Sequence, residues 1–415
     1  MVENSAIPAV KKYLNLYIIF KDSKKGTIMK IIFNRVAVSS AVAPLMCAVS
    51  GKSTLSTIEG ILIEAKFPDT CTMTTYDLEK GVRITIEAKV LEEGKYIINA
   101  QKFSQTLRVM DGEEVTLTVD SKMIATIVSG RSSHKMNALA GEDFPDIPPL
   151  TSDRSFIVGQ SVLKQMLAQV DFAMGVNDQR AVLNGTFFKI SDDNIMLVSC
   201  DSFKLAKCRR KTDLVNKNTN GKDHLEYSFI VPVKTINELS RLLCDDEEAL
   251  TQIFVTRKHI VLLIGELTFF SRLIEGEYID YDRIIMKNHK ITVKVDKKEL
   301  LSALDRAALV TEEKIAGSVR SHVKLEIAED ALKISAVSTA GSTYDELFIE
   351  HDGDNITIAF NNRYLMDSIK ACESERIVLT MSTALTSMNI EPVENNYDEK
   401  GSDEIFMLLP VRTKD

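Results

Sequence analysis

Cysteine is scarce in this chain of 415 residues, which contains only six. The cysteines lie far apart and form no C-x-x-C pair, so the sequence predicts neither a zinc site nor a disulfide framework. Long apolar runs are missing too, because none approaches the ~18 residues that a membrane helix requires. We therefore expect a soluble cytoplasmic protein with reduced thiols, most of them packed in the interior, and no membrane partner.

Motifs of the common enzyme classes are also missing. The six histidines form no H-x-x-x-H pattern, and no G-x-S-x-G string occurs. The string Gly51-Lys-Ser-Thr54 imitates the end of a P-loop, but the first glycine of that motif would fall at Met46. The string also follows a predicted helix, whereas a phosphate-binding loop lies between a strand and a helix. The sequence therefore predicts no catalytic residue, no metal and no cofactor.

The net charge of −8 argues against a generic nucleic-acid binder, which would carry a strongly basic face. A protein that encloses DNA needs only a weakly attractive inner surface, and an acidic exterior would discourage binding elsewhere. The net charge therefore argues against DNA binding through strong phosphate contacts, and it is compatible with a protein that encloses DNA.

A strand-to-helix pattern occurs three times. Segments beginning at Lys30, Ser155 and Lys290 each read as a short strand followed by an amphipathic helix, and their starts differ by 125 and 135 residues. After Leu163, for example, apolar residues recur at i+3, i+4 and i+7, which is the spacing of one helix face. A length prior of roughly 100–200 residues per domain also suggests about three domains.

A second strand-to-helix element follows in each repeat. When Ala100, Pro232 and Asn361 are aligned, the offsets are 132 and 129 residues. Segments of alternating polarity, such as Ile253–Leu263 and Ala331–Val337, lie between the helices and predict antiparallel strands. We expect an α+β fold with two helices on antiparallel sheets in each repeat.

Proline-rich and acidic segments indicate the boundaries between repeats. Residues 141–150 hold three prolines and predict an extended linker, and residues 276–282 occupy the matching place in the second repeat. We expect domains at 29–152, 153–286 and 287–415. Residues 1–28 are expected to be an extension or an upstream start, and they do not read as a secretory signal.

Five strings in this order and spacing carry a family resemblance: Arg180–Gly185, Asp201–Ala206, Phe229–Pro232, Glu275–Tyr281 and Met407–Arg412. Over residues 29–415 the chain resembles the bacterial beta sliding clamp, the beta subunit of DNA polymerase III. The resemblance implies three copies of the DNA-clamp fold and a head-to-tail homodimer that closes a ring around double-stranded DNA. It further implies a non-catalytic processivity factor that recruits DNA polymerase subunits, the clamp loader and repair proteins through short linear peptides.

The resemblance also implies a peptide-binding pocket between the second and third domains. The matching positions are Leu183, Cys200, Asp201, Lys204, Leu205, Pro232, Ile236, Asn361, Tyr364, Ser387, Met407, Leu409, Pro410 and Val411. An apolar chain end such as this one would fray unless it docked against something, so we expect a docked tail. The family usually has threonine, glycine and histidine where this chain has Cys200, Ser202 and Phe203, and we expect an altered peptide preference.

Contacts to DNA and between subunits follow from the same resemblance, with one addition from charge. Lys52, Gln179 and Arg180 are expected to contact DNA, and the basic run Lys207, Arg209, Arg210 and Lys211 is added from charge alone. The subunit contact is expected to pair Arg131, His134 and Met136 with Leu309 and Val310. A histidine at that contact raises the question of pH-sensitive closure.

Two other function classes stay open at this point. One is an enzyme on a repeated α+β scaffold that uses Asp201 with Cys200 or Cys208. The other is a peptide-binding adaptor that does not bind DNA. Turnover assays would reveal the first, and insensitivity to the loss of Lys52 and Arg180 would reveal the second.

Overall fold

A computed structural model describes residues 27–51, 53–219, 221, 224–311, 322–338 and 341–412. Contacts group the described chain into two compact units. Unit 1 runs to Thr151 and includes Val261–Ser271, and unit 2 comprises Ser152–Ile260 and the described residues from Arg272 onward. The expected extension, residues 1–28, lies outside the described residues except for Thr27 and Ile28, which begin the first strand.

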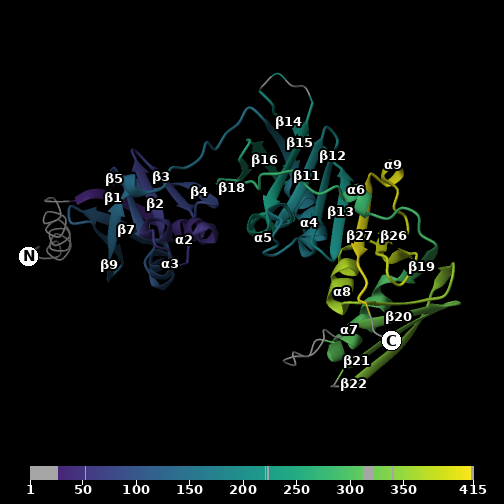
Figure 1. The fold of residues 1–415 in the computed structure, drawn as a ribbon. Helices are drawn as coiled ribbons and strands as arrows, with labels where there is room; N and C mark the ends of the chain where they lie inside the picture. The colour runs from purple at the N-terminus through teal and green to yellow at the C-terminus, as the bar shows by residue number, and fades with distance from the viewer. Residues whose placement is uncertain are drawn as a thin grey trace, which may run out of the picture. The chain divides into compact units, whose positions relative to one another are not determined.

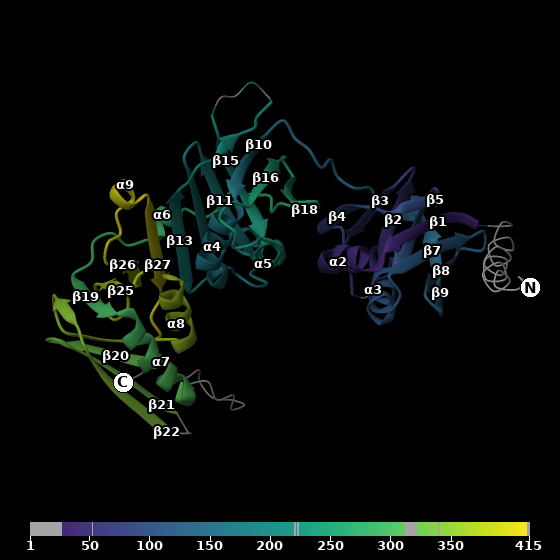
Figure 2. The same cartoon turned by 180° about the vertical axis from the view of Figure 1, so that it is seen from behind.

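Among the described residues, six helices of ten to fifteen residues follow a strand directly or after one residue, as the repeat predicts. The six pairs are β1 (Thr27–Asn34) with α2 (Arg35–Leu45), β6 (Gly94–Asn99) with α3 (Ala100–Val109), β10 (Ser155–Gly159) with α4 (Gln160–Val170), β15 (Glu226–Pro232) with α5 (Val233–Leu242), β19 (Ile291–Asp296) with α7 (Lys297–Thr311), and β24 (Ile356–Phe360) with α8 (Asn362–Ala371). In each repeat the two helices lie side by side (Figures 1 and 2).

The residue that directly precedes a helix often caps it. The side chains of Asn34, Asn99 and Asn361 accept hydrogen bonds from backbone N–H groups three residues on, at 3.0, 3.0 and 3.2 Å. Asp296 does the same for the N–H of Glu299 at 2.9 Å. Such caps satisfy N–H groups that have no partner within the helix, so they fix where each helix begins.

Unit 1 contains the first repeat. Its further strands are β2 (Gly60–Lys66), β3 (Thr70–Tyr76), β4 (Lys80–Glu87), β5 (Lys89–Glu92), β7 (Glu114–Asp120), β8 (Ile124–Ser129) and β9 (Ser132–Ala140). They form one antiparallel sheet in the order β5-β1-β7-β8-β9-β6-β2-β3-β4, which β18 (Leu267–Arg272) extends by pairing with β4. Met29, Ile31 and Phe33 alternate along β1 and are buried, in keeping with a strand that has one core face.

Unit 2 contains most of the second repeat and the third repeat. The second contributes β11 (Gly185–Ser191), β12 (Asn194–Cys200), β13 (Lys204–Lys211), β14 (Val215–Asn216), β16 (Leu250–Val255), the short α6 (Tyr281–Ile284) and the start of β17 (His259–Ile264), whose residues from Val261 onward belong to unit 1. The third contributes β20 (Val323–Ala328), β21 (Ala331–Ser338), β22 (Gly341–Phe348), β23 (Glu350–Asp352), β25 (Arg376–Met381), β26 (Met388–Pro392), α9 (Tyr397–Lys400) and β27 (Ser402–Leu408). The α+β architecture is therefore confirmed.

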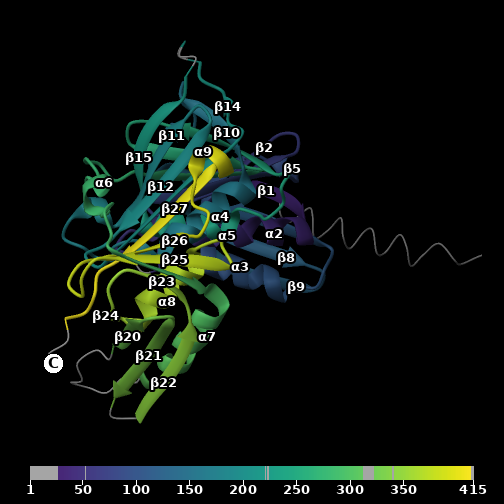
Figure 3. The ribbon, with the colours of Figure 1, turned by 90° about the vertical axis from the view of Figure 1, so that its right-hand side faces the viewer.

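One ladder joins the second repeat to the third. β13 and β27 pair antiparallel over seven residue pairs, from Lys204 opposite Leu408 to Arg210 opposite Ser402. A nine-stranded sheet results, in the order β15-β11-β12-β13-β27-β26-β25-β19-β23, and Figure 3 shows β27 within it. The predicted boundary near residue 286 thus lies inside one compact unit, and the three boundaries remain predictions.

One expected strand is divided in the structure. Residues 253–263 form two strands, β16 and β17, because the N–H of Thr256 bonds the carbonyl of His259 at 2.9 Å and closes a tight turn. Continuous apolar alternation on both sides of Thr256–Lys258 concealed the turn, which contains neither glycine nor proline.

We predict that Gly185→Ala destabilises unit 2. A Cβ at this position would stand 2.3 Å from the carbonyl oxygen of Val231, a backbone atom that cannot move without disturbing the β11–β15 ladder. We expect the free energy of unfolding to fall by about 1–3 kcal/mol, measured by urea or thermal unfolding. Gly51→Ala is the control, because a Cβ there meets nothing within 4 Å; equal effects of the two substitutions would contradict the packing argument.

Candidate functional site

Four of the predicted pocket residues meet in one apolar cluster. Leu183, Cys200, Leu205 and Met407 are each at most 4% exposed and pack with Met196, Val198 and Ile285. They come from the short turn Ala181–Leu183 and from β12, β13 and β27, so the β13–β27 ladder brings Met407 to the other three. Cys200 and Leu205 of this apolar cluster flank the loop 201–204, which lines the pocket described below.

A tight loop between β12 and β13 is organised by Asp201. Its Oδ1 accepts hydrogen bonds from the N–H groups of Phe203 at 2.6 Å and Lys204 at 2.8 Å. Its Oδ2 pairs with Lys204 Nζ at 2.5 Å. Because a carboxylate that accepts several hydrogen bonds holds its donors strongly, the loop presents Phe203 and Lys204 in fixed positions.

Helix α8 brings Tyr364 to this loop. Lys204 Nζ lies 4.8 Å from the centre of the Tyr364 ring, and the rings of Phe203 and Tyr364 are 6.3 Å apart. The side chain of Asn361 caps the helix at the N–H of Tyr364 and so orients its first turn. The structure therefore brings together Asp201, Lys204, Asn361 and Tyr364, which the resemblance named from distant parts of the sequence.

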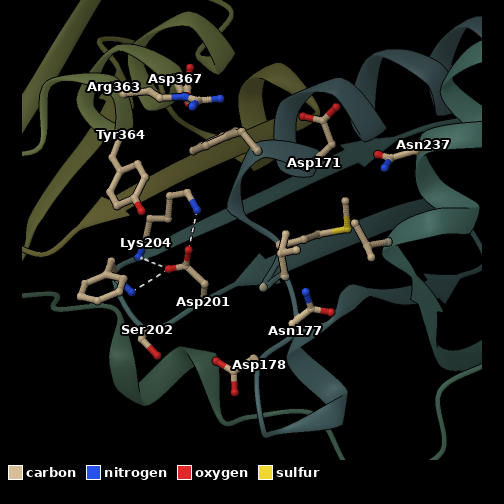
Figure 4. Close-up of a pocket in the computed structure, with 16 residues that line it drawn as sticks. Asp171, Asn177, Asp178, Asp201, Ser202, Lys204, Asn237, Arg363, Tyr364 and Asp367 are labelled. Carbon is tan, nitrogen blue, oxygen red and sulfur yellow. Dashed lines mark hydrogen bonds and ion pairs between the residues drawn. The ribbon is translucent and has the colours of Figure 1, made fainter. Parts of the chain in front are cut away.

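A pocket of about 660 Å³ opens beside these residues (Figure 4). Its walls are Asp171, Phe172, Met174, Gly175, Val176, Asn177, Asp178, Asp201, Ser202, Phe203, Lys204, Val233, Asn237, Arg363, Tyr364 and Asp367. The stretch after α4, residues 171–178, forms one whole wall, yet sequence reasoning named none of it. No periodic pattern distinguishes this stretch, and only the fold shows that it faces α8.

Other predicted pocket residues lie elsewhere. Pro232 directly precedes α5, and Ile236 is fully buried in that helix; neither belongs to the apolar cluster or the pocket wall. The aromatic segment after β18 takes a place beside the cluster instead, where Tyr278 stacks on Phe187 with ring centres 5.1 Å apart. The string Glu275–Tyr281 was the signal for this segment.

The tail that follows β27 is docked by its main chain. The N–H of Leu409 bonds the carbonyl of Phe203 at 2.8 Å, and the N–H of Val411 bonds the carbonyl of Ala359 at 2.7 Å. Pro410 between them is half-buried. Ser387 is buried. The tail thus contacts both repeats of unit 2, next to Phe203 on the pocket wall.

The charged side chains of Asp178 and Arg180, at the rim of the pocket, are paired with each other. Arg180 binds Asp178 through two hydrogen bonds of 3.1 and 3.0 Å and also donates to Ser202 Oγ at 2.9 Å. These bonds hold the pKa of Asp178 below its usual value, so the carboxylate stays ionised. Arg180 therefore braces the pocket rim in addition to its predicted role at DNA, and Gln179 beside it is exposed.

Burial has the opposite effect on Asp171. Desolvation raises the pKa of this carboxyl, the nearby charge of Asp367 raises it further, and a hydrogen bond from the N–H of Phe172 opposes the change. Burial also raises the pKa of the Cys200 thiol to about 12, with Asp201 adding to the effect. Cys200 is therefore a protonated, apolar member of the cluster at neutral pH.

The basic run on β13 is largely neutralised by ion pairs. Lys207 pairs with Asp282 at 3.7 Å, and Arg210 pairs with Glu373 at 2.8 Å. Arg209 pairs with Asp403 at 2.6 Å, and its guanidinium lies 3.7 Å from the centre of the Tyr397 ring. The sequence did not reveal these acidic partners, because they are distant from β13 in the chain. A contact of these residues with phosphate remains a prediction, and Lys52 lies outside the described residues.

The predicted subunit contact residues fall on two separate surfaces. Arg131 and His134 are exposed and Met136 is half-buried, the last two on β9 beside a hollow of about 530 Å³. On α7, Leu309 is 79% exposed and Val310 is 8% exposed. The pairing of these two surfaces between subunits remains a prediction.

Within the described ranges, no group of three or more histidine, cysteine, aspartate or glutamate side chains could hold a metal ion. None of the helices placed in the structure is both long and apolar enough to cross a membrane.

Comparison with known proteins accounts for nearly the whole described chain. Models of the N-terminal, central and C-terminal domains of the DNA polymerase III beta subunit match residues 29–148, 157–280 and 282–401. A beta sliding clamp of Staphylococcus aureus is 28% identical over 377 residues, which covers 88% of this chain and 94% of that protein. The DNA polymerase sliding clamp of Bacillus subtilis superposes with a TM-score of 0.84 at 24% identity, covering 93% of this chain and 100% of the other. The DNA polymerase III beta subunit of Thermotoga maritima superposes with a TM-score of 0.80 at 24% identity and the same coverage.

We predict that thiol reagents distinguish Cys200 from Cys244. Cys244 is exposed, whereas Cys200 is buried with its pKa raised to about 12, so its thiolate is rare at pH 8. Iodoacetamide should modify Cys244 in the native protein and Cys200 only after unfolding in urea, as followed by peptide mass spectrometry. Equal rates of modification at the two residues in the native protein would show that the apolar cluster is open to solvent.

Proposed function

The chain belongs to the family of DNA polymerase III beta subunits, and we propose that two copies of it close head to tail into a ring around duplex DNA. It is a DNA sliding clamp, a non-catalytic processivity factor. The single observation that carries the ring proposal is the repeat itself. The chain contains three tandem repeats with the same order of strands and helices, so two chains supply six equivalent repeats for a closed ring.

A closed ring explains how a chain with a net negative charge can serve as a DNA clamp. A closed ring keeps hold of a duplex without strong phosphate contacts, so a net charge of −8 and the ion-paired basic run on β13 are compatible with it. The benefit to a polymerase is effective concentration, because a tethered enzyme that lets go of the primer rebinds before it diffuses away. We propose the domain boundaries 29–152, 153–286 and 287–415 for the three segments, and action in the cytoplasm.

The thiol chemistry argues against the alternative of an enzyme that uses Asp201 with a cysteine. A cysteine nucleophile reacts as thiolate and therefore needs a lowered pKa. Burial instead raises the pKa of Cys200 to about 12 and also raises that of Cys208. Asp201 is fully engaged with its own loop.

The pocket beside Tyr364 is our proposed binding site for a short linear peptide from polymerase subunits, the clamp loader and repair proteins. Its support comes from its concave shape and from the aromatic and aliphatic side chains in its walls, which suit a few anchoring side chains. DNA contact at Lys52, Gln179 and Arg180 is proposed from the family resemblance alone.

Retention on circular DNA tests the ring. We expect light scattering to show a dimer, and clamps loaded on a nicked circle by the cognate loader and ATP to stay bound in about 1 M salt, where phosphate contacts are screened. Cutting the circle at one site should release them. Loss from intact circles at moderate salt would contradict topological binding, and a chain that binds polymerase peptides but is never retained would be an adaptor.

Tyr364→Ala tests the pocket. Removing the ring takes away the contact with Phe203 and the surface under Lys204, so we expect the dissociation constant for a polymerase-derived peptide to rise at least tenfold, about 1.4 kcal/mol. Fluorescence anisotropy measures the binding. Leu250→Ala, an exposed apolar position that does not line the pocket, is the control and should bind normally.

A further inference from the structure

The pocket wall carries more negative than positive charge. Four carboxylates line it, those of Asp171, Asp178, Asp201 and Asp367, against the two cations Lys204 and Arg363. Asp178 pairs with Arg180 outside the wall, and Asp201 pairs with Lys204. The remaining pair is loose, because Arg363 Nε lies 3.9 Å from Asp367 Oδ2 with its side chain 78% exposed.

Asp171 is the one of these four carboxylates that lacks a cationic partner among the described residues. It begins the short turn Asp171–Ala173 directly after α4, is half-buried, and forms no ion pair with any residue that the structure describes. Burial raises the pKa of this carboxyl most, and the charge of Asp367 raises it further against an opposing hydrogen bond from the N–H of Phe172. In Figure 4 both carboxylates lie away from Asp201 and Lys204, at the end of the pocket where α8 and the turn after α4 face each other.

The cation best placed to compensate is already engaged. Lys204 is buried, is bound to Asp201 at 2.5 Å and lies over the Tyr364 ring. An acidic side chain entering at Asp171 would therefore meet the like charges of Asp171 and Asp367, offset only by Arg363, which is exposed and loosely paired with Asp367 at 3.9 Å. A basic side chain there would gain attraction from both, strengthened because the site is partly shielded from water.

The other walls complete the chemistry of the occupant. Phe172, Met174 and Val176 stand on the same stretch as Asp171, and Phe203, Val233 and Tyr364 face the pocket from other elements. Aliphatic and aromatic surface thus lies next to the uncompensated carboxylate. An occupant that fits both features carries an apolar anchor and a cationic group within a few residues of each other.

We propose that this pocket selects peptides in which a lysine or arginine lies next to the apolar anchor, with Asp171 and Asp367 as the residues that recognise the cation. This selectivity rests on the proposed peptide-binding function and names its ligand class. The anchor supplies most of the affinity, and the charge pair decides between competing partners.

Synthetic peptides of the form Gly-Ser-X-Leu-Phe-Gly-Ser, labelled with fluorescein, test the proposal on the full chain. X is lysine, glutamine or glutamate, and a second set places X after the anchor. In about 50 mM salt we expect affinity in the order lysine, glutamine, glutamate, with at least a tenfold difference between the extremes in one of the two sets. Added salt should narrow the difference, because it screens charge pairs.

Variants locate the effect. Asp171→Asn and Asp367→Asn should each bring the lysine and glutamate peptides closer together in affinity, and the double variant should bring them within about twofold. Glu248→Gln, which removes one negative charge from an exposed residue outside the pocket, should leave the difference unchanged. Thermal unfolding checks that each variant is folded, and the comparison of peptides on the unaltered chain does not depend on any variant.

Acidification gives an independent readout. The preference for lysine should fade as pH falls, and earlier than for an ordinary aspartate, because the Asp171 carboxyl has a raised pKa and loses its charge first. Equal affinity for all three peptides, or a preference for glutamate, would overturn the charge selectivity and leave peptide binding intact. Failure of every peptide to bind, together with no effect of Tyr364→Ala on a polymerase-derived peptide, would overturn the proposed pocket itself.

Discussion

The main-chain ladder between β13 and β27 is the interaction on which the candidate site depends. It joins a strand of the second repeat to the last strand of the third, so residues two hundred positions apart share one sheet. Main-chain hydrogen bonds repeat at fixed spacing, and they therefore set the position of every side chain along both strands. Met407 joins the apolar cluster and Arg209 meets Asp403 because of this register.

The same ladder explains why two repeats form one compact unit. A surface contact between domains usually permits relative motion, whereas a shared sheet resists it. A buried polar group reinforces the joint: Glu404 on β27 accepts hydrogen bonds from Gln169 at 2.6 Å and from the N–H of Glu373 at 3.0 Å. Burial raises the pKa of Glu404, and the two donors limit the cost of its charge. A pocket walled by the turn after α4, by α5 and by α8 can keep its shape because this joint is stiff.

The spacing of apolar residues and the positions of capping and turn residues made most of the fold predictable from the sequence. Each helix start was visible as a strand-like run that changes to helical spacing, and Asn34, Asn99 and Asn361 are residues that favour such starts. The turn at Thr256–Lys258 escaped because it contains no glycine or proline. The site was predictable only where the family resemblance named its residues, as at Asp201, Lys204 and Tyr364. The resemblance did not name Asp171 on its turn or Asp367 on its helix face, and only the fold brings them together. The partners of Lys207, Arg209 and Arg210 escaped for the same reason, since charge along the chain says nothing about a carboxylate on another element.

The docked tail leaves room for variation among close relatives. Leu409 and Val411 are held through their N–H groups, and a main-chain bond is indifferent to the side chain attached to it. The side chains at these positions can therefore be exchanged, changing what the chain offers beside Phe203, while the tail stays in place. Proline is the exception, because it has no N–H to donate. At this edge of the site the side chains can therefore change in size and polarity while the backbone stays in place.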